Sequence, residues 1–290
     1  MADMHCKKRS PLVHTQFDTS FLHVTMAYSK VIHYCTRISN MVDNIWIPQK
    51  NLEDFCRIYA GLTNGTMTDH ASFTTWNTPG FFYCRNFIKE DPKENISDIA
   101  DQIITNTKNG NPHLTTYTKE LLPADTADIF YAKGFETLLT QYGMLFEKGT
   151  AFDTTTNDHI SIISEDELPA WTDTMIEGFV EDNKQREDVI YENLIRDPDT
   201  FFLAYRMEEK IVGTAILYLT DDFPGIAEVA VPRPYRGNKI ATSLIRRILQ
   251  MVHEYEKPGV TLQASPLGRP VYQSLGFQQV SEIHTIKLRQ

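Results

Sequence analysis

The spacing of apolar residues in the second half of the chain predicts alternating strands and helices. A short apolar run at 160–163 indicates a strand. Ser164 followed by Glu167 forms a capping-box pattern, which is typical of a helix start. Apolar positions then recur at helical intervals as far as Phe179, and a second helix is expected at about 189–195.

Further along, two β-rich runs at 200–207 and 211–219 are separated by three charged residues, which predicts a hairpin. A third strand is expected at 226–231. Apolar residues from Ile240 to Val252 are spaced three and four apart, so they fall on one face of a helix.

The last part of the chain predicts a strand at 260–263, a short helix at 269–275 and a strand at 284–288. With a second strand near the end, the order is β-α-α-β-β-β-α-β-α-β-β. This alternation is typical of an α/β protein.

A repeated pattern relates the two halves of the chain. Ile129–Phe135 aligns with Val271–Phe277, and each ends in Gly-Phe after a strand-like run. A second match aligns 80–85 with 200–206. On this alignment the first half lacks about 22 residues, which correspond to the region of 226–241. The alternative is coincidence, because a Gly-Phe match is short.

These patterns predict a loose arm at 1–25 and two α/β halves at 26–157 and 158–290. The 290 residues carry 28 Lys and Arg against 38 Asp and Glu, a formal net charge of −10. Such a chain repels nucleic acid and anionic membranes on average, so we expect neither as a partner. A cationic or neutral small substrate suits this balance better.

No apolar run reaches the roughly 18 residues that span a bilayer, and the start of the chain lacks the apolar core of an export signal. The four cysteines have no disulfide-framework or C-x-x-C spacing, so unpaired thiols in the cytoplasm are expected. The sequence also holds no histidine cluster or nucleophilic-serine motif, so no metal is expected.

The stretch from Glu228 to Ala241 is the most informative candidate site, because a strand ends and a helix begins there. The N-terminus of a helix offers free backbone N–H groups and a partial positive charge, which together bind phosphate oxygens. Arg236 and Lys239 add positive charge. The stretch indicates a pyrophosphate site, although a surface turn with two solvated basic residues would look similar.

This stretch resembles the phosphate loop of the GNAT superfamily of acyl-CoA-dependent N-acetyltransferases, Arg/Gln-x-x-Gly-x-Gly/Ala after a strand ending in Val. Here it is Arg236–Ala241. A second family signature, Tyr-x-x-x-Gly-Phe, matches Tyr272–Phe277 and follows Ala264-Ser265-Pro266. The resemblance covers about 158–290, and the first half matches only as a degenerate copy. It implies two GNAT-like domains, each a mixed, mostly antiparallel sheet flanked by helices.

The resemblance also implies acetyl-CoA as cosubstrate, with no metal. The residues that it assigns to binding are Val229, Ala230 and Val231 on the strand and Arg236, Gly237, Asn238, Lys239, Ile240 and Ala241 in the loop. Lys239 departs from the family, because glycine usually holds this position and lets the backbone approach the phosphates. A lysine there would either neutralise phosphate charge or block the site.

Two side chains are candidates for proton transfer. A protonated amine must lose a proton before it attacks, and Glu228 is the candidate base. Strand alternation places Glu228 opposite Val229 and Val231, and a solvated or salt-bridged glutamate is the alternative. The resemblance assigns the oxyanion contact to backbone N–H near Val231 and the protonation of the leaving thiolate to Tyr272, unless that ring is only packed in the core.

In the first half, Phe130 aligns with Tyr272 and has no hydroxyl, so a noncatalytic half is expected. Several of its aromatic residues are expected in the core: Trp46, Tyr59, Trp76, Phe81 and Phe82.

The prediction is therefore direct acetyl transfer to a primary amine, either of a small molecule or of a lysine side chain, without an acyl-enzyme. The alternative is a noncatalytic acyl-CoA-binding or protein-interaction module. The sequence does not choose the acceptor, the acyl-chain length or the oligomeric state.

Overall fold

The computed structural model describes residues 44–78, 84–108, 113–155, 157–179 and 188–289. The chain from Asn44 onward forms one compact unit. The predicted arm at 1–25 and Phe81 and Phe82 lie outside the described residues.

The first half holds three helices and five strands among the described residues. The helices are α2 (Ile47–Thr63), α3 (Ile96–Lys108) and α4 (Thr126–Ala132), with a 3-10 turn η1 (Lys119–Leu121). The strands are β1 (Thr66–Asp69), β2 (Phe73–Asn77), β3 (Cys84–Ile88), β4 (His113–Thr118) and β5 (Phe135–Glu147). Tyr59 and Trp76 are buried as expected, whereas Trp46 is half-buried.

The second half follows the predicted order closely. Its strands are β6 (Ile160–Ile162), β7 (Thr200–Met207), β8 (Lys210–Tyr218), β9 (Gly225–Ala230), β10 (Gly259–Ala264) and β11 (Gln278–Leu288). Its helices are α5 (Leu168–Phe179), α6 (Asp188–Leu194), α7 (Ile240–Glu254) and α8 (Arg269–Ser274), with 3-10 turns η2 (Glu165–Glu167) and η3 (Arg233–Tyr235). The capping box of Ser164 and Glu167 is confirmed.

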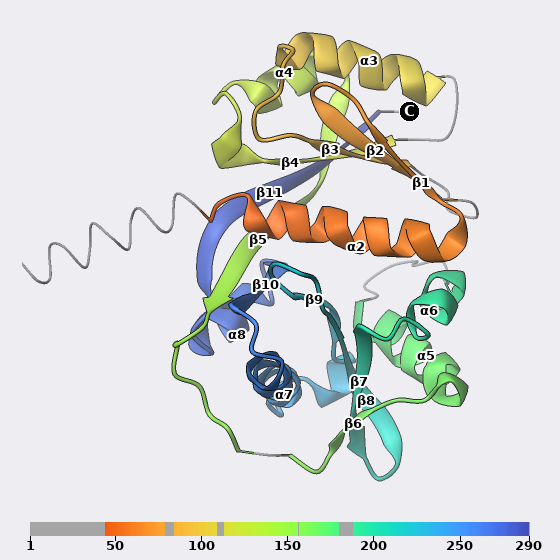
Figure 1. Cartoon of the computed structure of the whole chain (residues 1–290), viewed down its shortest axis with the longest axis vertical. Coiled ribbons are helices and arrows are strands. Elements are labelled where there is room, and N and C mark those ends of the chain that lie inside the picture. Colours follow the sequence, from red (N-terminus) through yellow and green to blue (C-terminus); the bar gives the residue numbers. More distant parts are fainter. Residues whose placement is uncertain (1–43, 79–83, 109–112, 156, 180–187, 290) are drawn as a thin grey trace, which may run out of the picture. The chain divides into compact units, whose positions relative to one another are not determined.

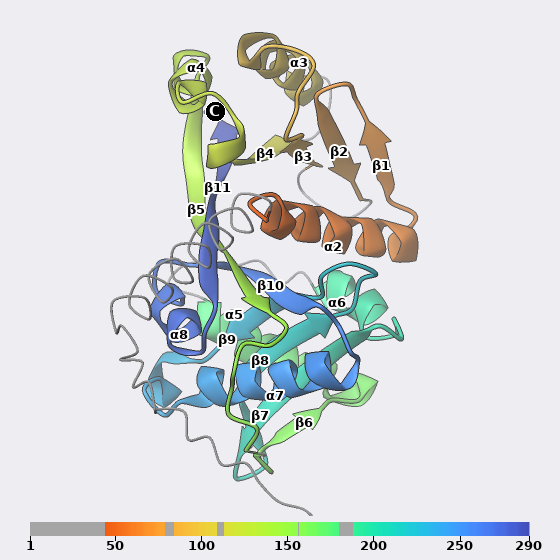
Figure 2. The ribbon, with the colours of Figure 1, turned by 60° about the vertical axis from the view of Figure 1, so that its left-hand side comes forward.

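All the described strands belong to one eleven-stranded sheet with the order β1-β2-β3-β4-β11-β5-β10-β9-β8-β7-β6. Strand β5, from the first half, lies between β10 and β11 of the second half. Strand β11 in turn lies between β4 and β5 (Figure 2). The sheet therefore runs without a break across the boundary predicted at 157 and 158.

The two exchanged strands are antiparallel over most of their length, from Phe135 opposite Leu288 to Leu145 opposite Gln278. The prediction of two strands at the end of the chain is wrong, since β11 is a single long strand. The sheet position beside β10 is filled by β5, whose backbone completes the hydrogen-bonded ladder there.

The two halves share a pattern of strand pairing. Strand β3 is parallel to β4 with α3 between them in sequence, as β9 is parallel to β10 with α7 between them. Strand β3 thus holds the sheet position of β9, not that of β7, so the alignment of 80–85 with 200–206 is wrong for the described Cys84 and Arg85.

The deletion expected from that alignment is also wrong. Strand β3 begins 51 residues before Phe135, and β9 begins 52 residues before Phe277. The loop that was expected to be missing is present as residues 89–95, and α3 follows it as the crossover helix.

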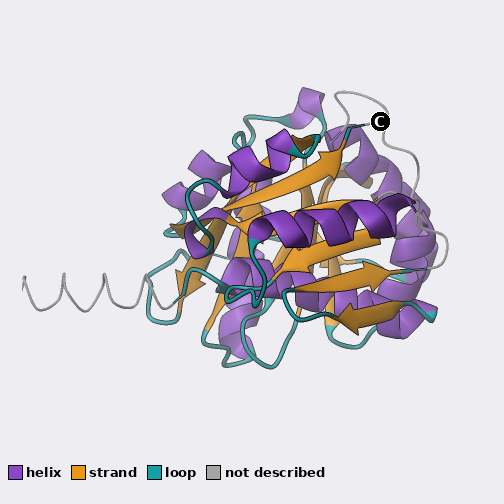
Figure 3. Cartoon of the chain, turned by 90° about the horizontal axis from the view of Figure 1, so that it is seen from above, coloured by secondary structure: helices purple, strands orange, loops and turns teal. Residues whose placement is uncertain are grey.

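Helices lie on both sides of the strands (Figure 3). In the second half, two hydrophobic clusters cover opposite faces of the sheet. Along β8, Val212 and Leu217 pack in the cluster that contains α7, whereas Ile216 and Tyr218 pack in the cluster that contains α5. Helix α7 lies close to the sheet, because a Cβ on Gly213 would meet Ile240 at 2.4 Å.

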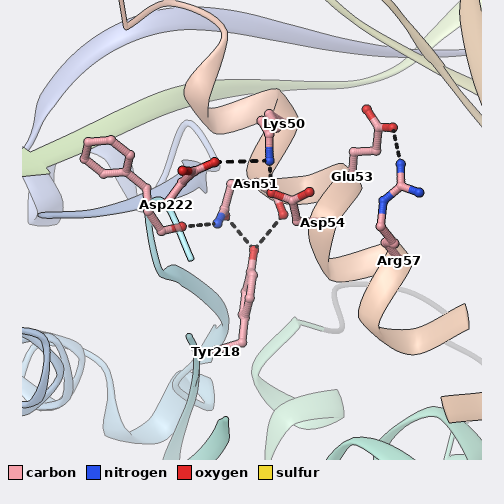
Figure 4. Close-up of polar contacts among 8 residues, drawn as sticks. Lys50, Asn51, Glu53, Asp54, Arg57, Tyr218 and Asp222 are labelled. Atoms are coloured by element: carbon pink, nitrogen blue, oxygen red, sulfur yellow. Dashed lines mark hydrogen bonds and ion pairs between the residues drawn. The ribbon is translucent and has the colours of Figure 1, made fainter. Parts of the chain in front are cut away.

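Helix α2 of the first half runs across the second-half strands β9 and β10 (Figure 1). Buried Asn51 donates to the Phe223 carbonyl at 2.8 Å and accepts from the Tyr218 hydroxyl at 2.6 Å (Figure 4). Gly225 leaves room for this contact, since a Cβ there would lie 2.0 Å from the Tyr218 ring. Beside it, Lys50 pairs with Asp54 and with Asp222.

Among the described helices, none combines the length and the hydropathy that a membrane-spanning segment needs. Among the same residues, Cys56 and Cys84 are buried free thiols. Burial raises the pKa of Cys56 to about 12, so this thiol stays protonated near neutral pH.

Candidate functional site

The candidate site begins where β9 and β10 separate. These strands are described along their whole length, and their parallel ladder joins only Gly225 to Thr261 and Ile226 to Leu262. Beyond these pairs β9 continues to Ala230 and β10 to Ala264, so an opening lies between the carboxyl ends of two adjacent parallel strands. Backbone groups that face this opening have no partner in the ladder between the two strands.

Strand β9 contains a β-bulge on the edge of the opening. Its register with β8 shifts between Thr214 and Ile216, and Glu228 has a positive φ of 51°. The Thr214 hydroxyl donates to the Glu228 carbonyl at 3.0 Å and helps to hold this strained residue.

The bulge removes the basis for the expected direction of the Glu228 side chain, because simple alternation does not hold through it. Val229 and Val231 pack on the α7 side of the sheet and Ala230 on the α5 side. Glu228 is half-buried, and its carboxylate forms no ion pair or hydrogen bond with a described residue.

The predicted phosphate loop lies between β9 and α7. Gly237 has a φ of 83°, and no atom lies within 4 Å of where a Cβ would be. Glycine is therefore favoured here by the backbone conformation of the turn and not by a close contact. Lys239 is the N-cap of α7 in the left-handed conformation, at φ 58°, and makes no side-chain cap. Asn238 donates to the Tyr235 carbonyl at 3.1 Å. The first amides of a 15-residue helix are therefore left without a side-chain cap.

The exposed side chain of Lys239 leaves the backbone in the conformation that a glycine favours. Ile240 is buried under the sheet and Ala241 is half-buried, so the start of α7 is fixed in place.

The Arg236 side chain turns back onto the protein. Its Nε donates to the Val231 carbonyl at 3.0 Å, and one Nη donates to the Gly178 carbonyl at 2.9 Å. Arg236 thus connects the phosphate loop, the end of β9 and the end of α5.

Tyr272 lies on α8 in the same hydrophobic cluster as Val229 and Val231. Its ring is 8% exposed and packs edge-on against Phe277 at 5.8 Å. Burial raises the pKa of the Tyr272 hydroxyl well above its usual value, and the hydroxyl bonds to no described residue. The phenol therefore holds its proton near neutral pH.

Two residues of the site were missed from the sequence. Gly178 packs against the end of β9, and Thr214 holds the bulge. A glycine inside a helical pattern, as in Glu177-Gly178-Phe179, is a signal of close backbone approach. Thr214 gives no such signal, because threonine is ordinary in a strand.

The corresponding place in the first half is closed. Strands β3 and β4 stay paired over four residues, from Cys84 with His113 to Phe87 with Thr116. Buried Gln49 of α2 then bridges their ends, since it donates to the Ile88 carbonyl and accepts from the Thr118 hydroxyl.

The crossover helix of the first half also differs from α7. The Asn95 side chain accepts from the Asp98 amide at 2.9 Å and so caps α3, and Asp98 adds negative charge there. Phe130 is fully buried and packs edge-on against Phe135 at 5.1 Å, as Tyr272 packs against Phe277. In the part of the chain that the structure describes, no group of three or more His, Cys, Asp or Glu side chains is placed to hold a metal ion.

Comparison with known structures extends over both halves. A GCN5-related N-acetyltransferase from Kribbella flavida superposes with a TM-score of 0.62 at 14% identity, over 81% of this chain and 95% of its own. A functionally unknown conserved protein from Staphylococcus epidermidis superposes with a TM-score of 0.58 at 13% identity, over 78% of this chain and 95% of its own. A GCN5-related N-acetyltransferase from Sphaerobacter thermophilus superposes with a TM-score of 0.55 at 12% identity, over 77% of this chain and 83% of its own. At these identities the likeness concerns the fold.

No curated protein matches the chain in sequence. A family model described as "Acetyltransferase (GNAT) domain" matches residues 167–285, from η2 to β11. This range contains the bulge, the phosphate loop and Tyr272. Residues 167–285 therefore carry a GNAT acetyltransferase domain.

Proposed function

We propose that this chain is an acetyl-CoA-dependent N-acetyltransferase that transfers the acetyl group directly to a primary amine. The observation that carries the proposal is the opening between β9 and β10 beside the uncapped start of α7. The match of residues 167–285 to a GNAT acetyltransferase domain supports it.

The residues around this opening fit acetyl-CoA. The amides at the start of α7, together with Gly237, Asn238 and Lys239, would hold the phosphate groups. The backbone of Val229, Ala230 and Val231 would bind the acyl arm. Acetyl-CoA would supply the activated thioester.

The side chains supply the proton transfers. Glu228 would take a proton from the ammonium form of the acceptor, directly or through water, and its carboxylate has no competing partner among the described residues. The Val231 amide would stabilise the charge that develops on the thioester oxygen. Tyr272 would give its proton to the departing thiolate.

The first half is proposed to be a degenerate, noncatalytic copy, with 26–157 and 158–290 as the two halves. The shared strand order and the nearly equal spacings of 51 and 52 residues to Phe135 and Phe277 support the duplication. The paired β3 and β4, the Gln49 bridge and the capped α3 support the absence of a cofactor site there.

The acceptor is proposed to be a cationic amine, on a small molecule or a lysine side chain. The net charge of −10 favours the approach of a cation.

The first experiment measures the thermal unfolding midpoint with and without acetyl-CoA. At a ligand concentration 100 times Kd, binding adds about 2.7 kcal/mol to the stability of the folded state. We expect a clear upward shift, and no shift would overturn the cofactor assignment.

Thiol release is then measured across polyamines, amino acids, aminoglycosides and lysine peptides. Turnover with any amine supports the transferase. Binding of acetyl-CoA without turnover across the panel would instead favour a noncatalytic acyl-CoA-binding module.

A further inference from the structure

Among the described residues, the strands and helices leave two backbone carbonyls near Arg236 without a partner, one just beyond the end of β9 and one in the last turn of α5. Val231 lies just beyond β9, where the ladder to β10 has already stopped. Gly178 lies in the last turn of α5, where carbonyls lack partners within the helix. Arg236 donates one N–H to each of them, at 3.0 and 2.9 Å.

Contact between α5 and β9 at this place is close. A Cβ on Gly178 would lie 2.8 Å from the Ala230 Cβ and 2.9 Å from the Val231 nitrogen. The last turn of α5 therefore packs directly on the Ala230–Val231 peptide, and the Arg236 guanidinium ties the two carbonyls on either side of that contact. A cation is also favourable near the C-terminus of a helix.

We infer that Arg236 is a positioning residue. It holds the Val231 peptide in place through two carbonyls and is not principally a phosphate ligand. This inference rests on the proposed function, because the Val231 amide matters to the rate only if acetyl transfer occurs beside it. The planar guanidinium is suited to the task, since its N–H groups point in fixed directions toward two acceptors.

The test compares Arg236→Ala, Arg236→Lys and Lys239→Ala in the full chain. Arg236→Lys keeps the positive charge but loses the planar guanidinium, whose N–H groups reach both carbonyls. Lys239→Ala removes one positive charge from the same loop without touching either carbonyl. For each variant, acetyl-CoA Kd is measured by calorimetry and kcat at saturating acetyl-CoA by thiol release.

Both Arg236 variants are expected to lower kcat by about 10-fold or more, with Kd changed by less than about threefold, because charge-assisted hydrogen bonds to the backbone are lost. Lys239→Ala is expected to raise Kd more than either of them. The inference is overturned if Arg236→Ala raises Kd about tenfold at unchanged kcat and Arg236→Lys restores binding.

Hydrogen exchange of the ligand-free protein gives a readout independent of activity. Both Arg236 variants should speed exchange at 227–233 and in the last turn of α5 but not in β7 and β8, and unchanged exchange would sink the inference. If wild type neither binds acetyl-CoA nor turns over while this local effect is present, the proposed function fails and the structural role of Arg236 stands.

Discussion

At the scale of single residues, the candidate chemistry depends on a few side chains in unusual settings. Glu228 has a left-handed backbone inside a strand, and Tyr272 has a buried hydroxyl without a described partner. Strained or buried polar groups of this kind are retained where the surrounding structure or the function requires them.

Tyr272→Phe removes the hydroxyl and keeps the ring. We expect kcat to fall at least about tenfold, as for loss of a general acid, while acetyl-CoA Kd stays nearly constant. Steady-state thiol release and calorimetry measure the two quantities. Equal turnover in variant and wild type would remove the acid role and leave the ring as core packing.

Lys239→Gly tests the cost of a left-handed N-cap. A residue with a Cβ has a cost of roughly 1–2 kcal/mol in this conformation, and glycine avoids that cost. Glycine also raises the conformational entropy of the unfolded chain, which offsets part of the gain in stability. We expect a net stabilisation of about 0.5–1 kcal/mol in urea unfolding. Lys239→Ala loses the same charge but keeps the Cβ, so a matching gain there would contradict the backbone explanation.

At the scale of elements, α2 is joined to the hairpin of β8 and β9 through Asn51. Asn51→Ala leaves the Phe223 carbonyl without its partner and leaves the Tyr218 hydroxyl only its longer bond to the backbone carbonyl of residue 51, at 3.3 Å. We expect a loss of about 2–3 kcal/mol, because buried polar groups are costly when unpaired.

Lys50→Ala is the matched control for Asn51→Ala. It removes the neighbouring ion pairs with Asp54 and Asp222, which are partly exposed, and should cost about 1 kcal/mol or less. Similar losses of unfolding free energy in the two variants would argue against a special role for the buried amide.

Elements with their own local pattern could be predicted from the sequence, and their partners could not. The capping box at Ser164 and the apolar face of α7 each depend on residues only three or four positions apart, so the sequence predicts both. The place of β5 beside β10 depends on pairing between residues more than 100 positions apart. Arg236 was recognised as a loop cation, but its acceptor Gly178 is 58 positions away and leaves no mark near it in the sequence.

At the scale of the whole molecule, each half contributes one strand to the other half's part of the sheet: β5 pairs with β10, and β11 pairs with β4. A fragment of residues 158–290 would leave β10 and β11 without the 13-residue β5 between them. Unpaired strand edges promote aggregation. We expect this fragment to show no cooperative unfolding and no stabilisation by acetyl-CoA, as judged by circular dichroism melts.

Co-expression with residues 44–157 should restore a soluble complex that binds acetyl-CoA, because that piece supplies β5. A fragment 158–290 that melts cooperatively and binds acetyl-CoA alone would show that the exchange of strands is dispensable.

The exchanged strands also constrain when the protein can fold as it is made. Strand β4 ends at Thr118, but its neighbour β11 begins only at Gln278, 160 residues later. A ribosome therefore exposes the first half with one of its central sheet positions vacant until most of the second half has been translated. Long-range pairing of this kind slows folding and exposes strand edges in the meantime. A chaperone would therefore be most useful while the first half has been synthesised and β11 has not, because the strand edges of β4 and β5 are then exposed.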